Sequence, residues 1–188
     1  MPPEPWEVLS SERDQSYRVF SLRTDLARSP RTGKVHPFFI LESSSWVNVI
    51  PITPNNEVVL VRQYRHGIQD LTLEIPGGVV DGDDTPGSTA ERELLEETGY
   101  RPEKMTLLGY VHPNPAIQNN RCYTYVAQGS FRAGGQALDD QEDIEVILKP
   151  LGRIPSLIRD GNITHALVLA AFYRFFMEYR SLKDPLEP

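Results

Sequence analysis

The chain has 188 residues, of which 39% are hydrophobic and 24% charged, values ordinary for one globular domain with room for a small addition. With 19 Lys and Arg against 26 Asp and Glu, the formal net charge is −7. An acidic chain argues against a nucleic-acid or membrane partner, and metal ions would have to mediate much of the contact with an anionic ligand. Cys122 is the only cysteine, which excludes an intrachain disulfide and suits a reducing compartment, so we expect a cytoplasmic protein.

Strand patterns dominate the first part of the chain. Residues 16–27 and 34–43 are strand-like runs on either side of the turn cluster at 29–33. They predict a β-hairpin or small sheet within residues 1–43. Three further strands are predicted, at residues 46–52, 57–64 and 71–75. The last of these leads into the pair Gly77-Gly78.

A helix with clear end signals follows the glycine pair. Thr85 is suited to the N-cap, Pro86 to the first helical position and Gly99 to the position after the last turn. The rest of the chain predicts strands at 105–111, 121–127 and 142–148, then helices at 154–159 and 164–180. Mixed strands enclosed by helices favour an α/β fold of the α/β/α sandwich type.

The predicted helix concentrates carboxylates on one face. Glu93, Glu96 and Glu97 are three and four residues apart, so they project from neighbouring positions on a helix. Such carboxylates repel one another unless the face is fully solvated or a divalent cation lies among them. Mg²⁺ and Mn²⁺ prefer oxygen ligands of this kind. The alternative is a solvated Glu-rich helix face stabilised by pairs four residues apart.

From Gly78 to Tyr100 the chain resembles the Nudix box, G-x5-E-x7-R-E-U-x-E-E-x-G-U, where U is a bulky aliphatic residue. The central Arg-Glu-x-x-Glu-Glu is intact. Two positions depart: Asp84 replaces the first Glu, and Tyr100 replaces the final aliphatic residue. The segments VVLVRQYRHG and LTLEIPGGVVD are similar to the ADP-ribose pyrophosphatase and nucleotide-sugar hydrolase branch of this superfamily.

The resemblance implies a Nudix-type α/β/α sandwich with a mixed sheet, preceded by a small N-terminal antiparallel β-sheet. Residues 1–43 would form a subdomain for dimerisation, giving a homodimer, and residues 44–188 the Nudix hydrolase domain. The implied activity is Mg²⁺-dependent cleavage of the diphosphate in ADP-ribose or a related nucleoside diphosphate sugar. The products would be a nucleoside monophosphate and a sugar phosphate.

The same resemblance assigns roles to individual residues. The metal ligands would be Gly78, Glu93, Glu96 and Glu97, holding two or more Mg²⁺, with Mn²⁺ as a possible substitute. The catalytic set would be Arg92, Glu97 and Glu142. In this set Arg92 fixes the carboxylates by charge-assisted hydrogen bonds, and Glu142, at the end of an acidic loop, acts as general base.

Substrate contacts are expected from Arg65, Glu74 and Trp6. Arg65 would bind phosphates bidentately, Glu74 would lie near the metals, and Trp6 is a candidate for stacking on a base. Each has a structural alternative: a surface salt bridge for Arg65, a solvent-facing strand end for Glu74 and a core position for Trp6, for which an interface role is also open. Glu142 could instead belong to a disordered acidic loop. His165, at the beginning of the last predicted helix, is interpreted as an ordinary first-turn residue.

Other functions remain open from the sequence. The chain could hydrolyse another dinucleotide or a nucleoside triphosphate. It could also be a Nudix-fold sensor that binds ADP-ribose without turnover, although the intact Arg-Glu-x-x-Glu-Glu argues against a module that needs no metal cluster. A nucleic-acid-binding protein fits the net charge poorly.

Overall fold

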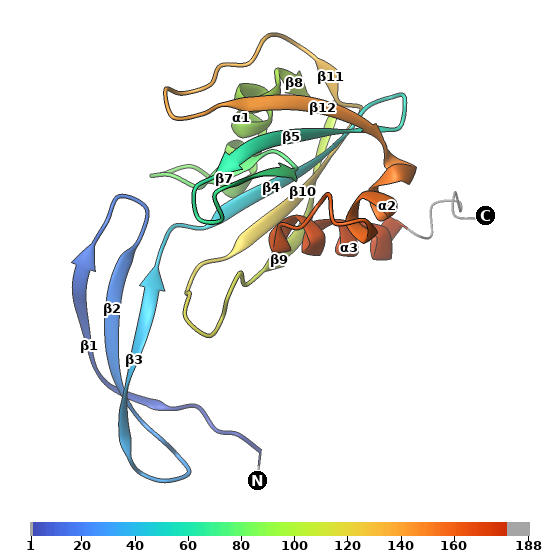
Figure 1. Cartoon of the computed structure of the whole chain (residues 1–188). Coiled ribbons are helices and arrows are strands. Elements are labelled where there is room, and N and C mark those ends of the chain that lie inside the picture. Colours follow the sequence, from blue (N-terminus) through green and yellow to red (C-terminus); the bar gives the residue numbers. More distant parts are fainter. Residues whose placement is uncertain (1, 180–188) are drawn as a thin grey trace. The chain divides into compact units, whose positions relative to one another are not determined.

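A computed structural model describes residues 2–179, which form two compact units (Figure 1). The N-terminal unit contains the residues up to 44 together with 112–121, and the sandwich unit contains 45–111 and the residues from 122. The sequence predicts a subdomain of residues 1–43, and the N-terminal unit of the structure also contains residues 112–121. The role of this unit in dimerisation stays a prediction.

The N-terminal unit is a three-stranded antiparallel sheet in the order β1-β2-β3. Its strands are β1 (Glu7–Ser16), β2 (Ser21–Arg28) and β3 (Val35–Glu42). The predicted small antiparallel sheet is confirmed, but the single run at 16–27 is wrong, because β1 ends at Ser16 and β2 starts at Ser21. Every residue of β1 is exposed, so this strand has no apolar alternation by which the sequence could show it.

A distant segment completes the N-terminal unit. The backbone N–H of Leu41 donates to the carbonyl of Ile117 at 2.7 Å, and that of Asn119 donates to the carbonyl of Leu41 at 3.4 Å. Residues 112–121 therefore pair with the end of β3.

The sandwich unit is built on a seven-stranded sheet in the order β12-β5-β4-β10-β9, with β6 on β5 and β7 on β4. Its strands are β4 (Trp46–Ile52), β5 (Glu57–Arg65), β6 (Asp70–Glu74), β7 (Gly77–Val79), β9 (Lys104–Val111), β10 (Cys122–Gln128) and β12 (Ile144–Pro150). Because β10 runs parallel to β4 while β9 runs antiparallel to β10, the sheet is mixed, as predicted. A separate short pair joins β8 (Tyr100–Arg101) and β11 (Phe131–Arg132).

The helices of this unit are α1 (Pro86–Thr98), α2 (Ile154–Arg159), preceded by a 3-10 turn at Leu151–Arg153, and α3 (Ala166–Tyr179). The ends of α1 are those that the sequence predicts: the hydroxyl of Thr85 accepts from the N–H of Ser88, and Gly99 is left-handed at φ 74°. The predicted helix 164–180 begins two residues later, at Ala166, and residue 180 lies outside the described residues.

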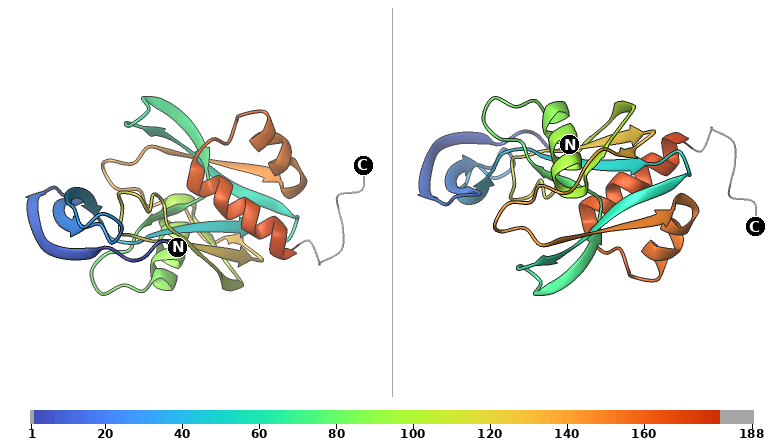
Figure 2. Two further views of the ribbon diagram at one scale, coloured as in Figure 1. Left: turned by 90° about the horizontal axis from the view of Figure 1, so that it is seen from below. Right: turned by 90° about the horizontal axis from the view of Figure 1, so that it is seen from above.

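Two core layers place α1 and α3 on opposite faces of the sheet (Figure 2). Successive side chains of a strand point to opposite faces, so β4 contributes Val47 and Val49 to the α1 side and Ile50 to the α3 side. Leu94 of α1 and Phe172 of α3 are fully buried against these two faces. The α/β/α sandwich is confirmed. No helix within residues 2–179 has the length and apolarity that crossing a membrane requires.

Candidate active site

A glycine strand and a helix face bring two carboxylates together. In β7, the N–H of Gly77 donates to Oε2 of Glu97 at 3.0 Å. A Cβ built on Gly78 would lie 2.4 Å from Oε1 of Glu93. Because Gly78 has no side chain, the carboxylate of Glu93 can rest against the backbone of β7, to which Glu97 is also hydrogen-bonded.

Both carboxylates are buried, and burial changes their protonation. Glu97 is 3% exposed, and burial, with the neighbouring charges of Glu93 and Glu142, raises its pKa to about 8 against the opposing hydrogen bond from Gly77. Burial also raises the pKa of Glu93; Glu96 and Glu142 add to that effect and Arg92 opposes it. Glu142 thus acts electrostatically on both carboxylates.

Arg92 holds several acids of the motif in place. Its Nη1 lies 3.0 Å from Oε1 of Glu93 and 2.9 Å from Oε2 of Glu96, and its Nε lies 3.7 Å from Oδ2 of Asp84. The shorter carboxylate at position 84 therefore still reaches the arginine. This is the arrangement expected for an arginine that orients carboxylates.

The donor set suits a hard divalent cation. Glu93, Glu96 and Glu97 offer carboxylate oxygens, and the raised pKa of two of them reflects acids buried together without enough compensating charge. Across residues 2–179, however, no three His, Cys, Asp or Glu side chains are already arranged around one ion position. The carboxylates instead face Arg92 and the N–H of Gly77, so an ion would have to displace these contacts.

Glu142 lies on a turn before β12. The N–H of Asp139 donates to its Oε2 at 3.2 Å, and its own N–H donates to the carbonyl of Asp139 at 3.1 Å. The predicted strand start at residue 142 is wrong, because β12 begins at Ile144. A residue on such a turn can reorient more easily than one in a strand ladder.

Arg65 and Glu74 form a bidentate ion pair across the β5–β6 hairpin. The Nε and Nη2 of Arg65 lie 2.8 and 2.7 Å from the two carboxylate oxygens, and Thr72 also donates to Glu74. Burial alone would raise the pKa of Glu74, but these hydrogen bonds outweigh it and hold the pKa below its ordinary value. Glu74 is 3% exposed, so the solvent-facing alternative is wrong. Arg62, by contrast, forms an exposed salt bridge with Glu145.

A cavity of about 560 Å³ connects this ion pair with the glycine strand. Its lining includes Arg65, Glu74, Gly78, Trp46, Asn48, Thr72 and His165. The last four were not predicted as site residues. Thr72 could have been found, because a residue two positions before Glu74 on a strand shares its face. For Asn48 and His165, no neighbouring residue in the sequence indicates that they line the site.

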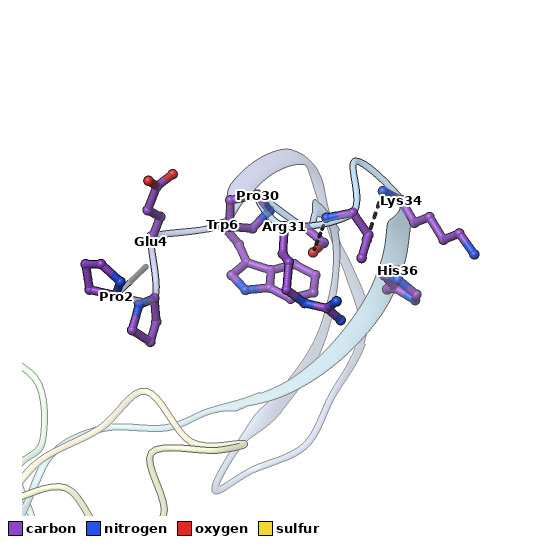
Figure 3. A pocket seen from close by; sticks show the side chains of 10 residues that line it. Pro2, Glu4, Trp6, Pro30, Arg31, Lys34 and His36 are labelled. Carbon is purple, nitrogen blue, oxygen red and sulfur yellow. Dashed lines mark hydrogen bonds between the residues drawn. The ribbon is translucent and has the colours of Figure 1, made fainter.

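Trp6 belongs to the N-terminal unit, whereas the carboxylates belong to the sandwich unit. Its ring makes edge contacts with those of His36 and Phe38, at centroid distances of 6.0 and 5.2 Å. It lines a cavity of about 760 Å³ together with Arg31 and Lys34 (Figure 3). An aromatic ring beside two cations suits a planar anionic group.

The sandwich fold and a carboxylate helix set against a glycine strand define the class of protein, an α/β/α sandwich whose carboxylate donors suit divalent cations. The family model described as NUDIX domain matches residues 45–172. The chain belongs to this family and is a Nudix hydrolase. Members of the family generally use divalent metal cations.

Similarity to individual proteins extends over almost the whole chain. The methanol dehydrogenase activator of Bacillus methanolicus is 30% identical over 182 residues, covering 96% of this chain and 95% of the relative. The ADP-ribose pyrophosphatase of Bacillus subtilis (strain 168) is 26% identical, with the same coverage. A crystal structure of an ADP compounds hydrolase matches the fold with a TM-score of 0.84 at 20% identity, covering 97% of this chain and 98% of that one. The resemblance to the ADP-ribose pyrophosphatase branch is confirmed.

Proposed function

We propose that this protein hydrolyses the diphosphate of ADP-ribose or a related nucleoside diphosphate sugar, using Mg²⁺. The observation that carries the proposal is the burial of Glu93 and Glu97 against Gly77 and Gly78 in a Nudix fold. The name of the B. subtilis relative, ADP-ribose pyrophosphatase, supports the substrate class.

In this proposal Glu93, Glu96, Glu97 and the carbonyl of Gly78 hold two or more Mg²⁺, or Mn²⁺ in their place. The bound ions would stabilise the negative charge on the phosphoryl oxygens and would lower the pKa of the attacking water. Arg92 keeps the carboxylates oriented. Glu142 accepts a proton from the attacking water as its oxygen bonds to phosphorus and the bond to the bridging oxygen breaks. The products are a nucleoside monophosphate and a sugar phosphate.

Substrate binding is assigned to Arg65, Glu74 and Trp6. Arg65 is 43% exposed at its side chain, so its guanidinium can contact a phosphate while Glu74 holds its orientation. The cavity beside Trp6 supports a role in stacking on the base. A cytoplasmic location is assigned because the single cysteine, Cys122, cannot form an intrachain disulfide, which suits a reducing compartment.

A homodimer is supported by the N-terminal unit, whose sheet leaves large apolar side chains exposed. They include Val8, Leu9, Val35, Phe38 and Phe39. Exposed apolar surface on a small sheet is typical of a protein interface.

The test is a substrate panel with Mg²⁺, in which phosphate is released from the products by alkaline phosphatase. The panel contains ADP-ribose, GDP-mannose, UDP-glucose, NADH, diadenosine polyphosphates and nucleoside triphosphates. Preferential turnover of one diphosphate sugar supports the proposal. Turnover of triphosphates or dinucleotides alone would replace it with the alternative hydrolase, and binding of ADP-ribose without turnover would replace it with the sensor.

A further inference from the structure

The lining of the cavity of about 560 Å³ includes residues that the proposed mechanism does not use. Arg65 and Glu74, to which it gives a role, also line this cavity. The residues around the start of α3, Thr164, His165 and Leu167, also contribute to its lining. The segment before α3 therefore presents side chains to the same space as the ion pair.

The orientation of the His165 ring is fixed by the helix. Its Nδ1 accepts a hydrogen bond of 3.3 Å from the N–H of Leu167, so the imidazole caps α3. A neutral imidazole that accepts at one nitrogen carries its proton on the other. Nε2 is therefore a hydrogen-bond donor. His165 lines the same cavity as Arg65 and Glu74, so its ring and the ion pair face a common space.

The chemistry of the cavity indicates what it would bind. Arg65 and Glu74 compensate each other's charge, so the cavity has no excess positive charge with which to bind a second phosphate. Uncharged groups surround them: the hydroxyls of Thr72 and Thr164, and the amide of Asn48. Donors and acceptors in the absence of net charge suit sugar hydroxyls, which both donate and accept.

One of these groups has unused hydrogen-bonding capacity. Within the described part of the chain, the amide nitrogen of Asn48 is buried and has no hydrogen-bond partner. A buried donor without a partner destabilises the fold, and a ligand or water that reaches it would relieve this. The ring of Trp46 adds an apolar surface to the same cavity.

We propose that His165 is a positioning residue that donates a hydrogen bond from Nε2 to a hydroxyl of the sugar phosphate half of the substrate in this cavity. The inference rests on the proposed function, because it names the part of a diphosphate sugar that the cavity receives. His165 thereby contributes to selection among sugars. It takes no part in the chemical step.

Two variants separate this role from helix capping. The amide oxygen of Asn in His165→Asn can accept from the N–H of Leu167, but the side chain is too short to replace the Nε2 donor. Gln in His165→Gln places an amide nitrogen close to the position of Nε2 and weakens the cap. His66→Asn is the matched control, since this exposed histidine is not among the residues that line the cavity.

The measurement is product inhibition of ADP-ribose hydrolysis by ribose 5-phosphate and by AMP, together with the melting temperature. If the panel selects another diphosphate sugar, its own two products replace these. His165→Asn should raise the inhibition constant of the sugar phosphate roughly 3- to 10-fold, the range of one neutral hydrogen bond. It should leave the constant for the nucleotide and the melting temperature unchanged. His165→Gln should show the smaller rise and the lower melting temperature.

The possible results distinguish the two proposals. If the wild type hydrolyses ADP-ribose but His165→Asn changes neither constant, changes both equally or changes only that of AMP, the role of His165 is wrong and the proposed function stands. The same holds if His66→Asn matches its effect. If the wild type hydrolyses no diphosphate sugar, the proposed function fails and the inference fails with it.

Discussion

Glu97 is a buried acid whose surroundings disfavour the ionised form of its carboxyl group. Its carboxylate is buried, accepts a hydrogen bond from Gly77 and lies within the influence of Glu93 and Glu142. Because the pKa rises to about 8, the metal-free protein at neutral pH holds a proton that a cation would have to displace. If a cation binds at Glu97 as proposed, its binding would therefore be coupled to the release of this proton.

We expect Glu97→Gln to abolish most of the activity while the fold persists. The amide keeps the size of the side chain and can still accept from Gly77, but it loses the negative charge for a cation. Turnover of the preferred substrate should fall by about 10²- to 10⁴-fold, as measured in the coupled phosphate assay. Glu91→Gln, on an exposed position of the same helix, is the matched control and should keep wild-type turnover. Unchanged turnover in Glu97→Gln would contradict the metal assignment.

The stability of the metal-free protein should fall as the pH rises. Between the unfolded value of 4.5 and the folded value of about 8, the native state binds more protons at Glu97 than the unfolded chain does. The free energy of unfolding then decreases with pH in this window and the contribution is lost as pH passes about 8. Melting temperatures in chelator, at intervals from about pH 5 to pH 9, should decline less steeply for Glu97→Gln. Parallel curves for both proteins would show that Glu97 ionises normally.

At the scale of elements, the site depends on how closely β7 and α1 approach. Gly78 lies under the carboxylate of Glu93, and Gly77 has the carbonyl of Val47 only 2.1 Å from the place of a Cβ. The two glycines therefore serve different contacts: Gly77 permits close packing of β7 on β4, and Gly78 permits the approach of the helix carboxylate.

Gly78→Ala should reduce activity more than stability. The added methyl group would meet the end of a flexible side chain, Glu93, which can move aside at small cost to the fold. A displaced carboxylate should lower kcat roughly 10- to 100-fold, because misplacement by about 1 Å is enough for such an effect. Gly152→Ala, where nothing lies within 4 Å of the new Cβ, is the control for the substitution itself. A variant with full activity would show that Glu93 does not need this position.

The sequence predicts elements well where their signals are local. The ends of α1 follow from Thr85, Pro86 and Gly99, which act within one turn of the helix. The pairing of Arg65 with Glu74 could not be read from the sequence, because the strand register places Arg65 opposite Asp70 and Glu74 opposite Val61. Strand β1 has no buried side, so no periodicity reveals it. The capping of α3 by His165 is equally invisible, since histidine is not a typical N-cap residue.

At the scale of the whole molecule, the N-terminal unit exposes large apolar side chains of the kind found in protein interfaces. Phe39 is 60% exposed on β3, near the other apolar residues of the same sheet. A second copy of the chain would bury such residues, and stable interfaces need about 1,200 Å² or more in total.

We expect the protein to run as a dimer, at twice its chain mass of 21.3 kDa, in light scattering coupled to gel filtration. Phe39→Glu should shift it toward the monomer, because a charge replaces an apolar contact in the interface. Tyr173→Glu, at a side chain that is also exposed but lies on α3, is the control and should leave the mass unchanged. A wild-type mass near 21.3 kDa would contradict the homodimer.

The chain enters the N-terminal unit a second time, at residues 112–121, and this makes the two segments of that unit depend on each other. Residues 112–121 leave the sandwich unit after β9, join the N-terminal unit and return at β10. There the N–H of Ser43 donates to the side chain of Asn119, and the amide of Asn120 donates to the carbonyl of Ser44. A deletion of the first 44 residues would leave this loop without those partners. We therefore expect substitutions at these contacts in the N-terminal segment to restrict the substitutions that the loop can accept, and the reverse.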